Sequence, residues 1–189
     1  MYTEFKAKFY IDLISFYKIL QKHQAQIVKN NTLMKRIIFE VPGAKNSQIR
    51  VRDEGNEIRL SYKSYDLSKK IDSAQEVDVL VENFDKTCEI IALLGLKKVR
   101  YVQNYREVFK LDDCFLMIDQ WPGLQPIVEI EGNSQESVEK ISKKLGFSMA
   151  AAMYGPTALL YQDAYGLSRE QFESIELLTF ENIPEILKK

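Results

Sequence analysis

The chain has 189 residues, 46% of them hydrophobic and 28% charged, which predicts a soluble globular protein of about one large domain. Its 26 Lys and Arg residues nearly balance 27 Asp and Glu residues, so no overall basic field favours nucleic acid or an anionic membrane as a partner. With one histidine and two distant cysteines, Cys88 and Cys114, a zinc site of the usual type is not expected and two free thiols are expected.

The N-terminus has no signal-peptide pattern, and the longest apolar stretch, IIALLGL at 90–96, is too short to cross a bilayer. Free thiols are typical of a reducing compartment. We therefore predict a cytoplasmic protein that contacts no membrane.

In chain order, strands and helices are predicted to alternate. We expect strands at 2–10, 26–41, 48–53, 57–65, 75–81, 97–111, 114–121 and 126–131. Helices are expected at DLISFYKILQKHQAQ after the N-cap Asp12, at NFDKTCEIIALLG up to Gly95, and at NSQESVEKISKKLGF, where Asn133 and Glu136 have capping-box spacing. Short helical pieces follow position 148, and Ser168 with Gln171 is expected to cap the last one.

Charged residues recur at every second position along most of the predicted strands. In TEFKAKFYID, Glu4, Lys6 and Lys8 alternate with apolar residues. Same-sign neighbours recur in other strands: Arg50 and Arg52, Glu76 and Asp78, Glu129 and Glu131. Like charges on one strand face repel, so an ordinary wet sheet surface gains nothing from them, although that surface is the alternative reading of any single strand.

The helices supply separate apolar faces, which favours helices outside a barrel and the charged faces inside it. A lumen with many Lys and Arg residues suits a phosphate chain, and carboxylates suit hard divalent cations such as Mg²⁺ or Mn²⁺. Both signs together therefore indicate a metal–polyphosphate complex as the ligand.

The order of these motifs resembles the CYTH family, the triphosphate tunnel metalloenzymes, which includes class IV adenylyl cyclases and thiamine or inorganic triphosphatases. The matching segments are TEFKAKF, IRVRDEG, IRLSYK, EVD, KKVRYVQNYREVFKLD and MIDQWPGLQPIVEIEG, within residues 2–147. The resemblance implies an α+β fold, a closed eight-stranded antiparallel β-barrel with flanking helices. It also implies a single domain, 1–189, with a barrel core at 2–147 and a C-terminal helical extension at 148–189.

The resemblance also implies roles for individual residues. Mg²⁺ or Mn²⁺ would be held by Glu4, Glu76, Asp78, Asp119, Glu129 and Glu131. Phosphates would be held by Lys6, Lys8, Arg36, Arg50, Arg52, Lys63, Lys98, Arg100 and Arg106. The catalytic residues would be Glu4, Lys8, Glu129 and Glu131. Asn104 stands where the family often has lysine, so Lys98 or Arg100 is expected to take over the phosphate contact of that lysine. The alternation alone leaves the orientation of Arg36 open.

The main departure from the family pattern is Lys6, which replaces the second carboxylate of an E-x-E-x-K motif. A lysine there should weaken metal binding but can neutralise phosphate directly. We therefore expect anion binding to survive and catalysis to weaken. The alternative is that Lys6 extends to a tunnel mouth and serves no site.

The predicted partner is a triphosphate-containing small molecule, and the leading prediction is a metal-dependent triphosphatase. The alternatives are a class IV adenylyl cyclase that makes cyclic AMP and pyrophosphate from ATP, and a non-catalytic module that binds polyphosphate or a nucleotide. A cyclase needs an adenine pocket, and Tyr154, Tyr161 and Tyr165 either stack a base or pack as helix residues. We favour packing, and therefore hydrolysis or binding over cyclisation.

Overall fold

The computed structural model describes residues 2–44, 46–65, 70–72 and 74–188, and the side chains of these residues from Phe5 onward. Its strands are β1 (Tyr2–Tyr10), β2 (Gln26–Glu40), β3 (Ser47–Asp53), β4 (Ile58–Tyr65), β5 (Ala74–Val81), β6 (Lys98–Leu111), β7 (Cys114–Gln120), β8 (Ile127–Gly132) and β9 (Leu177–Leu178). Its helices are α1 (Leu13–Lys22), α2 (Phe84–Leu93), α3 (Gln135–Lys144), α4 (Ala158–Tyr165) and α5 (Arg169–Glu173), with short 3-10 turns at Met149–Ala151 and Glu185–Leu187.

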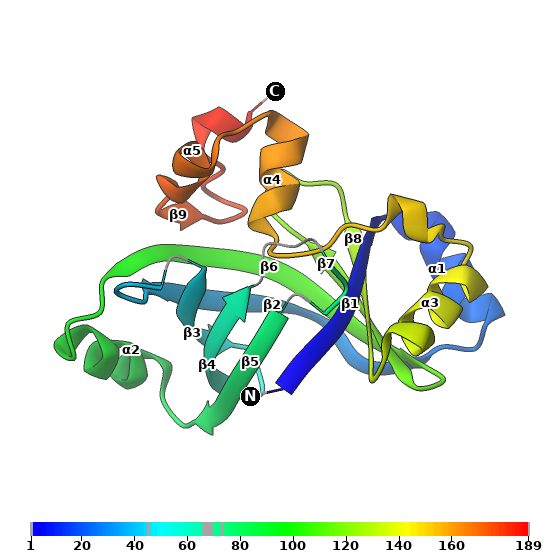
Figure 1. Ribbon diagram of the computed structural model, residues 1–189, viewed down its shortest axis with the longest axis horizontal. Coiled ribbons are helices and arrows are strands. Elements are labelled where there is room, and N and C mark those ends of the chain that lie inside the picture. Colours follow the sequence, from blue (N-terminus) through cyan, green and yellow to red (C-terminus); the bar gives the residue numbers. More distant parts are fainter. Residues whose placement is uncertain (1, 45, 66–69, 73, 189) are drawn as a thin grey trace.

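The first eight strands form one curled antiparallel sheet (Figure 1). The sheet order is β2-β3-β4-β5-β1-β8-β7-β6-β9, with a further pairing of β2 with β6. The short β9 is parallel to β6. Each of the eight predicted strands is present with ends within one residue of those predicted, and the α+β class is confirmed.

The prediction of a closed barrel is confirmed only as far as this curled sheet. The seam between β1 and β5 is short among the described residues, where Tyr2–Glu4 pair with Ala74–Glu76. Beyond that point the edge of β1 is covered by backbone from outside the sheet. Lys6 N donates to Ile71 O at 2.9 Å, and Lys8 exchanges two 3.0 Å backbone hydrogen bonds with Met153. Loop segments therefore fill the place that a longer β5 would occupy.

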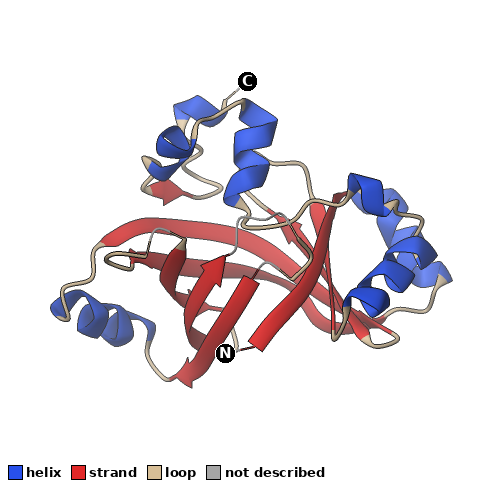
Figure 2. Cartoon of the chain, viewed as in Figure 1, coloured by secondary structure: helices blue, strands red, loops and turns tan. Residues whose placement is uncertain are grey.

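The helices cover the outside of the sheet (Figure 2). Apolar residues of α1 and α3 pack with β1, β7 and β8, including Phe16, Ile118 and Ile141. The C-terminal helices pack over another part of the sheet through Tyr161 and Phe172. Helix α2 lies at the opposite end of the molecule from α1 and α3 (Figure 1). None of the helices in the described residues is long and apolar enough to span a membrane.

The predicted helix starts are confirmed at two places and corrected at a third. Asp12 accepts a hydrogen bond from Ser15 N at α1, and Ser168 forms a capping box with Gln171 at α5. At α3 the capping box joins Ser134 and Ser137, so the predicted pair Asn133 and Glu136 is wrong by one residue. The Ser134 hydroxyl caps α3 in the way that was predicted for the Asn133 side chain, since both are good N-cap groups.

Gly132, at the end of β8, lies tightly against α3. A Cβ atom there would lie 2.9 Å from Cys114 Sγ and closer still to Ser137 Oγ. We expect Gly132→Ala to lower the free energy of unfolding by about 1–3 kcal/mol, because the extra methyl group overpacks this contact. Chemical denaturation measures the loss. Adding Ser137→Ala removes the nearest atom and should restore part of the stability; a simple sum of the two losses would contradict this account.

Candidate triphosphate-binding site

The inner face of the curled sheet borders a cavity of about 420 Å³ that is lined mainly by charged side chains. The lining includes eight Lys and Arg residues and six Asp and Glu residues. They are Lys6, Lys8, Arg36, Arg50, Arg52, Arg59, Lys63, Arg106, Glu54, Glu57, Glu76, Asp78, Glu129 and Glu131. The charged stripes therefore face a cavity, and the orientation of Arg36 is settled as inward.

One wall of the cavity joins β1 to β8. The register places Lys6 opposite Glu131 and Lys8 opposite Glu129. Lys6 Nζ lies 2.8 Å from Glu131 Oε2 and 3.3 Å from Glu129 Oε1, and Lys8 Nζ lies 3.5 Å from Glu129 Oε2. Burial alone would raise the pKa of Glu129, but the Lys6, Lys8 and Arg106 cations outweigh it and hold that pKa well below the usual value. Both carboxylates of β8 are thus paired with ammonium groups of β1.

A second wall is formed by β3, β4 and β5. Glu76 accepts hydrogen bonds from Arg50 Nη2 at 2.7 Å and Lys63 Nζ at 2.9 Å, and all three side chains are buried. Asp78 accepts one from Arg59 Nη1 at 3.1 Å. Each carboxylate of this wall therefore also has a cationic partner.

Three charged lining residues were not among the predicted site residues: Glu54, Glu57 and Arg59. Arg59 alternates with Lys63 on one strand face, so the period-two pattern could have identified it. Glu54 and Glu57 lie in and beside the hairpin turn between β3 and β4, where no strand periodicity applies. The turn itself carries no signal that its carboxylate folds back over the cavity.

At the third wall, Arg106 and Asp119 form a two-pronged ion pair between β6 and β7. Arg106 Nε lies 2.6 Å from Asp119 Oδ1, and Nη2 lies 2.5 Å from Oδ2. Asn104 donates to the same carboxylate at 2.9 Å and accepts from Arg36. Asp119 is only 1% exposed and is not part of the cavity lining, although it was predicted as a metal ligand. It instead holds the Arg106 guanidinium in place.

Two predicted phosphate ligands lie away from the cavity, which corrects that prediction. Lys98 is exposed at the start of β6. Arg100 donates to the backbone oxygens of Ile175 and Phe172 at 2.6 and 2.9 Å, with its guanidinium 4.3 Å from the centre of the Phe172 ring. Arg100 has the same strand parity as Arg106, but the C-terminal helices cover that half of the strand.

The three tyrosines considered for base stacking are not part of the cavity lining. Tyr161 is buried and donates to Pro122 O at 2.7 Å, and Tyr165 donates to Gly123 O. Tyr154 packs against the apolar cluster under α1 and α3. The packing interpretation is therefore supported for all three. The aromatic residues that do line the cavity are Tyr65, Phe115 and Trp121.

Several buried donors at the cavity lack a hydrogen-bond partner among the described residues: Arg36 Nε, Arg50 Nε, Arg52 Nε and Trp121 Nε1. The arginines also repel one another. Burial, and then the nearby Arg52 and Arg50 charges, lower the pKa of Arg36 well below its usual value. Burial and Arg50 lower the pKa of Arg52 to about 10. An anion placed between these guanidinium groups would relieve the repulsion and accept from the unbonded donors.

The described carboxylates do not fit a resident divalent ion as they stand. Among the described residues, no three His, Cys, Asp or Glu side chains come together as a metal site. Glu76, Asp78, Asp119, Glu129 and Glu131 are instead each engaged by Lys or Arg. The side chain of Glu4 lies outside the described residues, although its backbone pairs with Ala74 in the sheet. Metal binding by this set stays a prediction.

The structure thus belongs to the class of α+β folds in which a curled antiparallel sheet has a charged inner face. The model of the CYTH domain matches residues 4–153, so this chain belongs to the CYTH domain family. A "Putative adenylate cyclase" of Methanocaldococcus jannaschii is 30% identical over 92 residues, which are 49% of this chain and 53% of that protein. The chain thus matches about half the length of that curated relative.

Solved structures share the fold across most of the chain. A conserved hypothetical protein of Pyrococcus furiosus superposes with a TM-score of 0.69 at 25% identity, covering 79% of this chain and 94% of that one. A protein of Pyrococcus horikoshii gives a TM-score of 0.71 at 18% identity, covering 92% and 99%. These likenesses support the fold independently of the motifs.

Proposed function

We propose that this chain binds the phosphate chain of a triphosphate-containing small molecule inside the charged cavity. The observation that carries the proposal is a group of three arginines, Arg36, Arg50 and Arg52, whose buried Nε atoms have no hydrogen-bond partner among the described residues and whose charges repel one another. Phosphate oxygens are the acceptors that suit several convergent guanidinium groups. In this proposal the sheet at 2–147 carries most of the site, and the extension at 148–189 adds Gly155–Thr157 to its lining.

The charge of the cavity supports an anionic ligand that displaces existing ion pairs. Among the described residues, eight cations and six carboxylates line it, so the cations of this set are in excess even before any pairing is broken. The lining arginines and lysines come from β1, β2, β3, β4 and β6, which surround the space instead of forming one flat patch. A linear chain of phosphates can contact several of these strands at once, whereas a single phosphate can contact few.

For the reaction, we propose slow hydrolysis of the terminal phosphate. Water oxygen bonds to the terminal phosphorus, the bond from that phosphorus to the bridging oxygen breaks, and the protons of water end on the products or solvent. Arg106, Lys8 and Lys63 would stabilise the charge that develops on the leaving phosphate. Turnover is expected to be slow because Glu129 and Glu131, the proposed catalytic carboxylates, are tied to ammonium groups. Cyclisation of ATP is less favoured because the three tyrosines are used in packing.

Titration calorimetry with tripolyphosphate, ATP, thiamine triphosphate and orthophosphate tests the proposal. We expect the triphosphates to bind and orthophosphate to bind at least tenfold more weakly, since it reaches fewer cations. At a ligand concentration of 100 times Kd, the free energy of unfolding should rise by about 2.7 kcal/mol. Phosphate and cyclic AMP are measured in the same samples. The proposal fails if no triphosphate binds with or without Mg²⁺, and rapid cyclic AMP formation would replace hydrolysis with cyclisation.

A further inference from the structure

We infer that the Lys6 ammonium is a built-in cation that neutralises Glu129 and Glu131, so that this cavity binds a triphosphate without a divalent metal ion. The inference rests on the proposed function and extends it to the ionic form of the ligand. From the sequence alone we expected Lys6 to weaken metal binding and to neutralise phosphate directly; here Lys6 instead neutralises two carboxylates. In the structure Lys6 lies between the two carboxylates that were predicted to share the metal.

The sheet register produces this arrangement. Lys6 and Glu131 are direct cross-strand neighbours, and Glu129 lies two residues away on the same face of β8. Lys6 Nζ is 2.8 Å from one carboxylate and 3.3 Å from the other, and its side chain is only 16% exposed. Lys6 therefore extends along the wall inside the cavity, and the alternative of a lysine that extends to a tunnel mouth does not describe it.

Among the described side chains of β1 and β8 that line the cavity, positive and negative charges are equal in number before any ligand arrives. Lys6 and Lys8 together supply two positive charges opposite Glu129 and Glu131, as many as one divalent ion would supply. Arg106 Nη2 adds a third cation at 3.8 Å from Glu129. A divalent ion that approached Glu129 and Glu131 would be repelled by the nearby Lys and Arg cations. It would also find both carboxylates already paired. Metal affinity in the absence of ligand should therefore be low.

The cavity-lining arginines of β2 and β3 complete the argument. Arg36, Arg50 and Arg52 supply donors for phosphate that need no metal bridge. Lys6 meanwhile keeps the carboxylates of β8 from repelling the incoming phosphate chain. An ordinary structural ion pair would give the same geometry but would leave ligand and metal affinities unchanged when altered. The two readings therefore differ in what binding measurements report.

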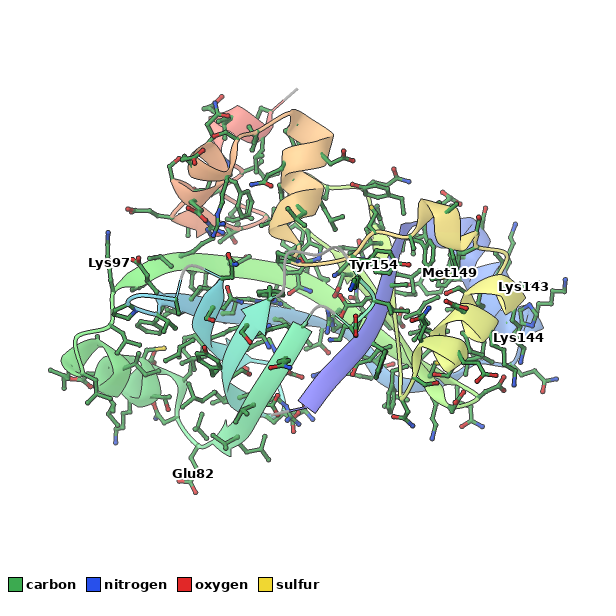
Figure 3. All side chains as sticks on the ribbon, in the orientation of Figure 1. Glu82, Lys97, Lys143, Lys144, Met149 and Tyr154 are labelled. Carbon is green, nitrogen blue, oxygen red and sulfur yellow. The ribbon has the colours of Figure 1, made fainter. Side chains whose placement is uncertain are left out.

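The test compares wild type, Lys6→Gln, Lys6→Arg and the control Lys97→Gln. Lys97 is an exposed lysine between α2 and β6 in the sequence, and its side chain lies on the outside of the molecule (Figure 3). Tripolyphosphate is titrated in EDTA by calorimetry, and Mn²⁺ binding to the ligand-free protein is followed by electron paramagnetic resonance. Wild type, Lys6→Arg and Lys97→Gln should bind tripolyphosphate in EDTA, and Lys6→Gln should bind it roughly tenfold to a hundredfold more weakly. Mn²⁺ should bind Lys6→Gln at least tenfold more tightly than wild type.

Each contrary result overturns a different claim. Wild type that binds tripolyphosphate only with metal, or that binds Mn²⁺ at micromolar concentration without ligand, overturns the role of Lys6 and leaves triphosphate binding in place. No binding under either condition overturns the proposed function itself. Equal affinities for Lys6→Gln and wild type in both measurements make Lys6 a structural ion pair. The wild-type measurements decide even if Lys6→Gln does not fold.

Discussion

Replacing Arg106 with alanine should lower the free energy of unfolding by about 3–5 kcal/mol. The partner carboxylate, Asp119, is 1% exposed and receives two short hydrogen bonds from this one guanidinium group. After the substitution, Asn104 would be the one described side chain that still donates to it. A buried carboxylate left without its counter-charge is among the most destabilising changes that a single substitution can make. Urea denaturation followed by circular dichroism measures the loss.

The control for this prediction is Arg169→Ala. Arg169 forms an exposed pair with Glu173 one turn along α5, at 2.5 Å. Exposed pairs of this kind contribute less than about 1 kcal/mol, so the control should unfold close to wild type. Suppose that Arg106→Ala lost no more stability than Arg169→Ala. The Asp119 carboxylate would then not depend on the Arg106 guanidinium as its counter-charge, and the stabilising role given to this ion pair would be wrong.

Replacing Arg52 with alanine should raise the Kd for tripolyphosphate about tenfold to a hundredfold while leaving the fold at least as stable. Arg52 has a buried, unbonded Nε, and burial together with the neighbouring Arg50 lowers its pKa to about 10. Removing it therefore relieves repulsion as it removes a phosphate donor. Its partner Glu54 retains Lys29 Nζ at 3.1 Å. Calorimetry gives the affinity, and thermal unfolding gives the stability.

Arg100→Ala provides the opposite pattern. Arg100 bonds to the backbone of the C-terminal segment and is absent from the cavity lining. Its loss should reduce stability without changing affinity for tripolyphosphate. Equal losses of affinity in both variants would mean that Arg100 contributes to the site, as the sequence alone suggested. Unchanged affinity in Arg52→Ala would remove the arginine wall from the account.

The strands and most of the charged residues of the cavity lining could be predicted because one physical rule governs both. Alternation along β1, β3, β4 and β8 assigns one face to the apolar core and the other to the inside of the sheet, and the curl of the sheet then brings those inner faces together. Like-charged neighbours such as Glu129 and Glu131 made the inner face recognisable. No knowledge of strand register was needed to place them on the same wall.

Register and long-range packing were beyond the same rule. Alternation assigns Arg100 and Arg106 to one face, but only the position of the C-terminal helices separates their surroundings. The partner of Lys6 depends on which residue of β8 lies opposite it, and strand sequences alone do not specify that pairing. The short seam between β1 and β5 likewise depends on Ile71 and Met153, which lie outside every predicted strand.

The place of β1 in the sheet has a consequence for how the chain folds. Strand β1 precedes the other strands of the sheet in the sequence but lies between β5 and β8, and its Tyr10 pairs with Ile127, far along the sequence. Pairings of such large sequence separation are slow to form. During synthesis β1 therefore cannot pair with β8 until most of this sequence has left the ribosome. Removing β1 would not trim the sheet at an edge. It would separate β5 from β8 and create two new edges, each able to pair with another chain.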